Sequence, residues 1–262
     1  MPRLAAFARR NPSLLLAGLA LGLLTLGRLE PALAPYAPWA AAGVMAAALV
    51  LIHGRDRVAR QAARAAIFDD CLSLFESVQA RQQDGGGYPV LEGRYLGHEI
   101  RLEPVLDHLA WRKLPSLWLK ATLLAPTAYA GVLDLIARPQ GAEFYSPSGE
   151  LPIRLPTPAD WPAEVTVCAD DQDASPPLDR IAQHMSLFED PQMKELLVTP
   201  RGVRLVRQVW QGQRAEYLVL RQAKFPQSRL DPGVVSSLLK ALTALSETMA
   251  PPGPPGVARA AA

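Results

Sequence analysis

Two apolar runs without charged residues lie within the first 53 residues, and they constrain the fold more than any other feature. The runs cover residues 13–27 and 37–53, the second counted with a neutral histidine. Each falls somewhat short of the roughly 20 residues that cross a ~30 Å hydrocarbon core. The first run lengthens if Arg28 and Glu30 lie near the headgroups, and the second can begin at residue 35. We therefore predict a transmembrane hairpin over residues 1–54, with spans at about 13–33 and 35–53.

The connection between the two runs is rich in proline. Pro31, Pro35 and Pro38 interrupt a helix and favour a turn. Tyr36 and Trp39 stand at the same place, where amphipathic rings prefer the membrane interface. Two short helices joined by a tight loop fit this pattern.

Two other interpretations of the N-terminal region remain open. A cleaved signal peptide would use Arg9 and Arg10, the first apolar run and an Ala32-Leu33-Ala34 site. Against it, Pro35 would follow the cut directly and a second apolar run would come next. A single long core helix of a soluble protein would be broken by the prolines.

Arginines concentrate in the same N-terminal part of the chain. Residues 1–65 carry eight arginines against Glu30 and Asp56, a net charge of +6, and the remainder carries −4. Three arginines precede the first span and four follow the second, so the positive-inside rule places both termini and the C-terminal domain in the cytoplasm. We expect a multi-pass protein of the bacterial inner membrane, with the short loop on the periplasmic side.

Small and basic residues give this region candidate contact sites. Gly18 with Gly22, and Gly43 with Ala47, have the spacing of packed membrane helices. That spacing is compatible with self-association, with packing of the two spans on each other, or simply with an Ala/Gly-rich composition, and we favour the last two. Several arginines just beyond a span would meet anionic lipid, each contributing ~1 kcal/mol; these are Arg55, Arg57, Arg60 and Arg64.

The rest of the chain indicates one α+β domain. A juxtamembrane helix is expected over residues 55–84, because apolar residues from Phe68 to Val78 recur at helical spacing before Gly85. Short strand-like runs come next in neighbouring groups, which favours a largely antiparallel sheet packed with two or three helices over residues 85–250. Residues 251–262 form an expected flexible tail. The expected strands are 90–95, 98–105, 117–124, 132–137, one near Ile153, 164–169, 196–199, 203–210 and 215–221.

The last helix gives the clearest pattern. Asp231 followed by Pro232 supplies an N-cap and a proline in the first turn. The apolar stripe behind it consists of Val235, Leu238, Leu239, Leu242, Leu245 and Met249. A shorter helix is expected after Ser175, with Leu178, Ile181, Met185 and Phe188 on its buried side.

Two N-terminal spans, a following helix, a strand-rich region and the segments KELLVTPRGVRLVRQVW and LDPGVVSSLLKALTALSETM together resemble uncharacterised families of bacterial two-span membrane proteins. Those families are known as domains of unknown function. The resemblance covers most of the chain and brings no catalytic residues. It implies a small cytoplasmic domain tethered to the inner membrane.

Common catalytic motifs are missing from the sequence. It contains no G-K-[ST] phosphate loop and no G-x-S-x-G nucleophile elbow. The best metal candidate is the segment HEIRLEPVLDH, although a strand would place His98 on the opposite face from Glu99 and Glu103. A polar strand edge therefore explains His98, Glu99, Glu103, Asp107 and His108 better than a metal site.

The remaining polar candidates also have simple structural interpretations. Cys71 and Cys168 are expected to be buried small hydrophobes rather than a redox pair. Asp170, Asp171 and Asp173 lack the glycine and glutamate of a calcium loop, so a solvated acidic loop is expected. A membrane-surface contact is the functional interpretation of Trp111, Arg112 and Lys113, and half-buried core tryptophans beside basic loop residues are the alternative.

From these patterns we expect a membrane-anchored, non-enzymatic interaction or assembly protein. Its partners would be the lipid bilayer and a protein or a second copy of the chain, without nucleic acid and without a cofactor. A lipid- or small-ligand-binding module tethered to the membrane is the alternative. A metal-dependent membrane enzyme using residues 98–108 ranks third.

Overall fold

The structure of the chain is a computed structural model. It describes residues 12–83, 87–107, 114–141, 143–162, 164–212, 214, 217, 225 and 227–252. The chain divides into two compact units, residues 1–62 and 63–262. Each unit is described by itself.

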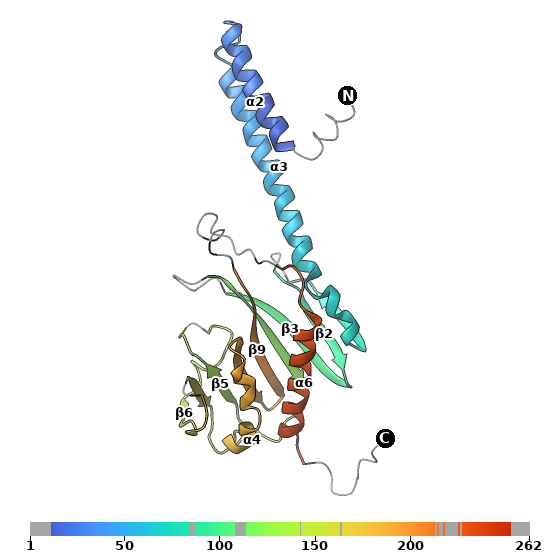
Figure 1. Cartoon of the computed structure of the whole chain (residues 1–262), viewed down its shortest axis with the longest axis vertical. Coiled ribbons are helices and arrows are strands. Elements are labelled where there is room, and N and C mark those ends of the chain that lie inside the picture. The colour runs from blue at the N-terminus through green and yellow to red at the C-terminus, as the bar shows by residue number, and fades with distance from the viewer. Residues whose placement is uncertain are drawn as a thin grey trace. The chain divides into compact units, whose positions relative to one another are not determined.

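In the described part of the first unit, residues 12–62, two helices lie side by side, α2 (Pro12–Leu29) and α3 (Ala37–Ala65, whose last residues belong to the second unit) (Figure 1). They approach closely because small residues face each other: a Cβ added to Gly27 would lie 2.3 Å from the Cβ of Ala37. Helix α2 ends where Glu30 donates its N–H to Leu26, and the proline-rich turn follows. The buried residues of the seam are Ala20, Gly27, Ala37, Ala41 and Ala48.

Large apolar side chains cover the outside of this unit. Leu19 is 53% exposed, Leu49 64% and Trp39 79%. A water-soluble protein rarely presents such a continuous apolar surface. The helical run Ala37–Leu74, which is α3 with the short helix that follows it, is long and apolar enough to cross a membrane.

The described residues of the second unit form one nine-stranded sheet in which all neighbouring strands are antiparallel, so the fold is α+β as expected. The strand order is β1-β2-β3-β4-β9-β8-β5-β7-β6. The strands are β1 (Ser77–Arg81), β2 (Val90–Tyr95), β3 (His98–Asp107), β4 (Ser116–Leu124), β5 (Leu133–Ala137), β6 (Ile153–Leu155), β7 (Val165–Ala169), β8 (Met193–Thr199) and β9 (Gly202–Gln211).

Helices cover one face of this sheet and enclose the core. Helix α6 (Pro232–Met249) crosses β4 and β9, and the carboxylate of Asp231 accepts the N–H of Gly233 at 2.7 Å as its N-cap (Figure 1). Every residue of its predicted apolar stripe is at most 2% exposed. The other helices that the structure describes in full in this unit are η1 (Ala66–Leu74), α4 (Leu178–Ala182) and η2 (Met185–Glu189), which bury residues including Phe68, Ile181 and Phe188.

The segment 55–84 differs from the prediction of one helix. Helix α3 ends at Ala65, a 3-10 helix continues to Leu74, and β1 then pairs with β2. The spacing from Phe68 to Phe75 predicts a helix correctly, but beyond Phe75 the pattern changes. Val78 is half-buried between exposed neighbours, which is the two-residue period of a strand at a sheet edge.

Several other predicted elements are confirmed. Leu96 and Gly97 form the two-residue turn between β2 and β3, with φ angles of 48° and 78° that fit a hairpin turn of the primed type. The short strand near Ile153 is β6. The predicted strand 215–221 lies outside the described residues except for Tyr217, and so does most of the tail, from residue 253 onward.

Candidate functional site

The sheet of the second unit has one apolar and one polar face. Strand alternation places Leu91, Leu102 and Ala121 side by side against the helices, all at 0% exposure. The next row of cross-strand neighbours points the other way and consists of Gln79, Glu92, Arg101, Thr122 and Arg204. The polar face therefore holds the charged side chains, and we treat it as the candidate functional site.

A covering segment, residues 143–148, lies over the polar side of β5, β8 and β9. Lys194 holds its start through a 2.9 Å ion pair with Glu143. The hydroxyl of Ser146 donates to Asp134, and Arg204 donates from Nη2 to the carbonyl of Tyr145 at 3.3 Å. This part of the polar face is consequently shielded from water.

Two carboxylates and one guanidinium are buried beneath the covering segment. Asp134 and Glu195 are both 0% exposed. Arg204 donates two hydrogen bonds to Glu195, from Nε to Oε2 at 2.9 Å and from Nη2 to Oε1 at 3.0 Å. This bidentate geometry is the strongest that arginine offers a carboxylate.

The electrostatics of these carboxylates favour a bound proton. Burial and then the negative charge of Glu195 raise the pKa of Asp134 to about 7. Burial also raises the pKa of Glu195, although Arg204 opposes that effect. Because burial and the charge of Glu195 outweigh the opposing effects of Ser146 and Arg204, the pKa of Asp134 lies close to neutral pH.

Three buried polar atoms near this cluster have no hydrogen-bond partner among the described residues: Asp134 Oδ1, the Tyr145 hydroxyl and Trp118 Nε1. The rings of Trp118 and Tyr145 touch, with centroids 5.7 Å apart. Burial and the neighbouring carboxylates raise the pKa of Tyr145. An unpartnered buried polar group costs about 1–3 kcal/mol, so the cluster is held in place at a cost to stability.

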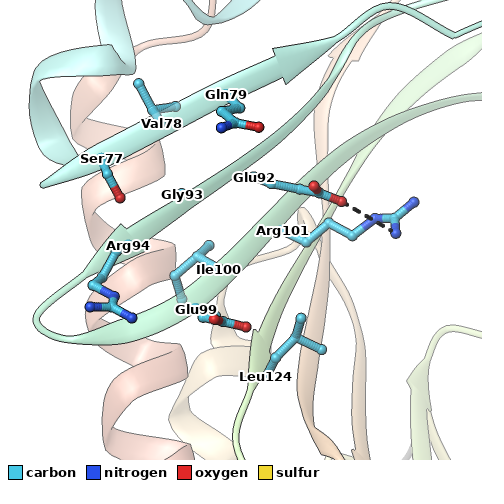
Figure 2. Close-up of a pocket in the computed structure, with 10 residues that line it drawn as sticks. All are labelled: Ser77, Val78, Gln79, Glu92, Gly93, Arg94, Glu99, Ile100, Arg101 and Leu124. Carbon is cyan, nitrogen blue, oxygen red and sulfur yellow. Dashed lines mark ion pairs between the residues drawn. The ribbon is translucent and has the colours of Figure 1, made fainter.

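The other half of the polar face, over β1 to β4, forms an open depression of about 440 Å³. Figure 2 shows the ion pair between Glu92 and Arg101, cross-strand neighbours in its lining, with a shortest N–O separation of 3.7 Å. Arg94 and Glu99 are cross-strand neighbours on its floor, yet neither makes an ion pair with a described side chain. An exposed ion pair such as Glu92–Arg101 contributes little to stability. The charged side chains of the depression therefore remain available for an external partner.

The predicted metal-binding residues do not gather. His98 lies on the opposite face of β3 from Glu99 and Glu103, as the alternation predicts. Glu103 pairs with Lys120 at 3.1 Å. His108 lies outside the described residues, and within the described part of the chain no three His, Cys, Asp or Glu side chains could hold a metal ion.

The two cysteines are buried and unpaired in separate elements, as expected. Burial, with a contribution from Asp70, raises the pKa of Cys71 to about 11, so its thiol is unreactive near neutral pH. In the acidic loop, Asp170 accepts the N–H of Val132 at 2.6 Å and Asp171 accepts the N–H of Asp173 at 2.9 Å. These carboxylates organise the loop itself.

The small residues that the sequence predicts as contacts between the spans do not lie in the seam between α2 and α3. Gly18, Gly22, Gly43 and Ala47 are exposed, and the contact is made instead by the alanine and glycine seam described above. Self-association through these four residues remains the alternative that the sequence leaves open.

The predicted membrane-surface residues are placed only in part. Arg55 and Arg57 are exposed on α3, while Arg60 and Arg64 are half-buried and Arg64 lies 5.5 Å from the ring centre of Tyr88. Trp111, Arg112 and Lys113 lie outside the described residues.

Sequence reasoning missed the buried acids. Asp134 and Glu195 each interrupt an apolar strand, LDLIA and MKELLVT. A single acid inside such a run signals a buried charge, because buried carboxylates are rare unless paired. The partner Arg204 follows from the hairpin of β8 and β9.

Comparisons with known proteins do not place the chain in a family. No family model matches it, and no curated protein matches it. A solved structure, the mycobacterial trehalose monomycolate transport factor A, TtfA, is similar over 70% of this chain and 80% of its own. The identity is 12% and the TM-score 0.35, which is too low to establish a shared fold.

Proposed function

We propose that this chain is a membrane-anchored, non-enzymatic interaction or assembly protein of the bacterial inner membrane. Its hairpin would span the bilayer at residues 13–33 and 35–53, with both termini and the α+β domain in the cytoplasm. The domain would present the open half of its polar face to a protein partner.

The observation that carries the proposal is the apolar exterior of the first unit. The buried residues of its seam are alanines and one glycine, while Leu19, Leu49 and Trp39 are exposed. In water this arrangement would expose most of the apolar area, whereas in lipid the same side chains are solvated. Small residues in the seam and large ones outside are typical of packed membrane helices.

The orientation rests on the arginines and on the turn. Arg55 and Arg57 are exposed just beyond the apolar part of α3, where anionic headgroups would attract them. Tyr36 and Trp39, at the turn, are 70% and 79% exposed, which suits the opposite interface.

Cysteine labelling tests the topology. We would introduce Ala34→Cys in the turn and Asp179→Cys on α4, both at exposed positions, and treat cells with a membrane-impermeant maleimide that reaches the periplasm. The proposal predicts that Ala34→Cys is labelled in intact cells and Asp179→Cys only after lysis. The wild-type chain is the control, because its two cysteines are buried. Labelling of Asp179→Cys in intact cells would contradict the proposed orientation.

Charge reversal on the polar face tests the interaction role. A partner that copurifies with the full chain in mild detergent should be lost from the double variant Arg94→Glu, Arg101→Glu. The matched control is Arg180→Glu, an exposed arginine on α4 away from the depression. Equal recovery of the partner with the double variant and with Arg180→Glu would exclude the open half of the polar face as its binding site. Lipid that survives detergent exchange and disappears with Arg94→Glu would favour the ligand-binding alternative.

A further inference from the structure

The two edges of the sheet differ in how they are protected. Strand β6 at one edge has three residues, and Pro152 and Pro156 flank it. Short length and proline are common devices that keep an edge strand from pairing with another chain. Strand β1 at the other edge has five residues, contains no proline and carries one charge, at Arg81.

Strand β1 is regular as well as unprotected. All five of its residues are in continuous register with β2, without a bulge. Among the described residues, β1 pairs with β2 and with no other strand. Every second N–H and C=O along its outer side is therefore available to a further strand, since an edge strand uses only half of these groups.

We propose that β1 is an interface between two copies of this chain, in which the β1 strands pair antiparallel about a twofold axis and join the two sheets. In the pairing centred on Gln79, this residue lies opposite the partner's Gln79. Ser77 then lies opposite the partner's Arg81, and Val78 opposite the partner's Ala80. The same patch serves both copies, as twofold symmetry requires.

Side-chain chemistry favours a second copy as the occupant. On the polar face the pairing places no like charges directly opposite, and Arg81 is already beside Glu92 of its own chain, at 3.9 Å. On the other face Val78 packs against the edge of the core, and a partner's alanine beside it would extend the apolar layer. An unrelated strand would need to match both faces, whereas an identical strand matches them by symmetry.

The membrane anchor explains how so small an interface would suffice. Two five-residue strands bury less than the roughly 1,200 Å² of a stable complex in solution. Tethering both copies to one membrane raises their effective concentration, which compensates for weak intrinsic affinity. This step rests on the proposed membrane anchoring.

Disulfide trapping in native membranes tests the pairing. Residues directly opposite in an antiparallel pair have Cβ atoms about 4.5–5.5 Å apart, so the full chain with Gln79→Cys should form an oxidised dimer with a mild oxidant. Thr122→Cys lies in the same cross-strand row but on the interior strand β4, and it should form no disulfide-linked dimer. The wild-type chain, whose two cysteines are buried, should also form no disulfide-linked dimer.

A charge exchange then separates loss of pairing from loss of folding. Gln79→Lys and Gln79→Glu should each lower the yield of dimer by a general amine or carboxyl cross-linker several-fold, because like charges would oppose each other. Coexpression of the two variants with different tags should restore the dimer as a mixed pair. A misfolded variant would not be rescued in this way.

The outcomes distinguish this inference from the proposed function. If Ala34→Cys labels as expected but Gln79→Cys gives no dimer, the self-pairing is wrong and the anchoring stands. If Gln79→Cys cross-links to a different protein, β1 binds that protein and the proposed self-pairing is wrong. If the protein is not in the membrane, the proposed function fails whatever the dimer yield.

Discussion

Asp134 and Glu195 lie buried on the neighbouring strands β5 and β8, and Arg204 on the next strand, β9, forms its two-bond ion pair with Glu195. Asp134 has a hydroxyl donor, Ser146, on one carboxylate oxygen and no described partner on the other. The arrangement is more stable when Asp134 carries a proton. Several measurable properties of the domain follow from this relationship.

Stability should fall as pH rises through the range from about 4 to about 7. The pKa of Asp134 is raised from 3.8 to about 7, so the folded state binds more protons than the unfolded state in this window. The stabilisation is complete below the unfolded value and is lost above the folded value. Urea unfolding of the full chain in detergent should therefore give a higher midpoint near pH 5 than near pH 8.

The variant Asp134→Asn is the matched test of that pH dependence. Asp134→Asn should remove most of the dependence of the urea midpoint on pH. It should also raise that midpoint near pH 8, because the amide stays neutral. Part of the slope should persist, since the pKa of Glu195 is raised as well. An unchanged slope in Asp134→Asn would assign the effect to other groups.

Removal of Arg204 should be severely destabilising. Arg204→Met leaves Glu195 buried without its ion pair, and breaking a buried pair in this way costs about 3–5 kcal/mol. Arg101→Met is the control, because the Arg101 side chain is 46% exposed in its pair with Glu92, and surface pairs are worth about 0–1 kcal/mol. Thermal unfolding followed by near-UV circular dichroism would compare the two. Equal losses of stability in Arg204→Met and Arg101→Met would contradict the assignment of Arg204–Glu195 as a buried ion pair.

Tyr145→Phe should be tolerated and should raise stability slightly. The hydroxyl of Tyr145 is buried without a partner among the described residues, so its removal relieves a desolvation cost of about 1–3 kcal/mol while the ring contact with Trp118 remains. A loss above ~1 kcal/mol would show that this hydroxyl has a partner, such as ordered water.

Helix α6 should behave as a core element. Leu242→Ala empties a fully buried site and should cost about 2–5 kcal/mol. Asp231→Ala removes only the N-cap bond to Gly233 and should cost about 1 kcal/mol. Chemical unfolding measures the loss of unfolding free energy in each variant. A larger loss in Asp231→Ala than in Leu242→Ala would mean that the packing of α6 contributes little to stability.

The sequence predicts most of the second unit because its signals are local. The stripe of α6, the Leu96-Gly97 turn and the alternation in β3 each depend on neighbouring residues. The strand character of β1 was missed because Val78 fits both a helical spacing from Phe75 and a strand alternation. Pairing with β2 decides between them, and a long-range contact leaves no trace in a short window.

The candidate site was less predictable for the same reason. Asp134, Glu195 and Arg204 come from three strands, and β5 is separated from β8 by more than fifty residues. Their chemistry arises only when the sheet order β9-β8-β5 brings them together beneath the covering segment. The 98–108 segment, by contrast, concentrates polar residues in sequence, but strand β3 places His98 on the opposite face from Glu99 and Glu103.

Alkaline extraction tests the membrane anchoring most directly. Membranes from cells that express the full chain would be washed with carbonate at high pH, which removes peripheral proteins, and the pellet and supernatant compared. The anchoring predicts that the protein stays in the pellet and that a chain beginning at residue 63 is released. Recovery of the full chain in the supernatant, or in the soluble fraction without detergent, would contradict the account.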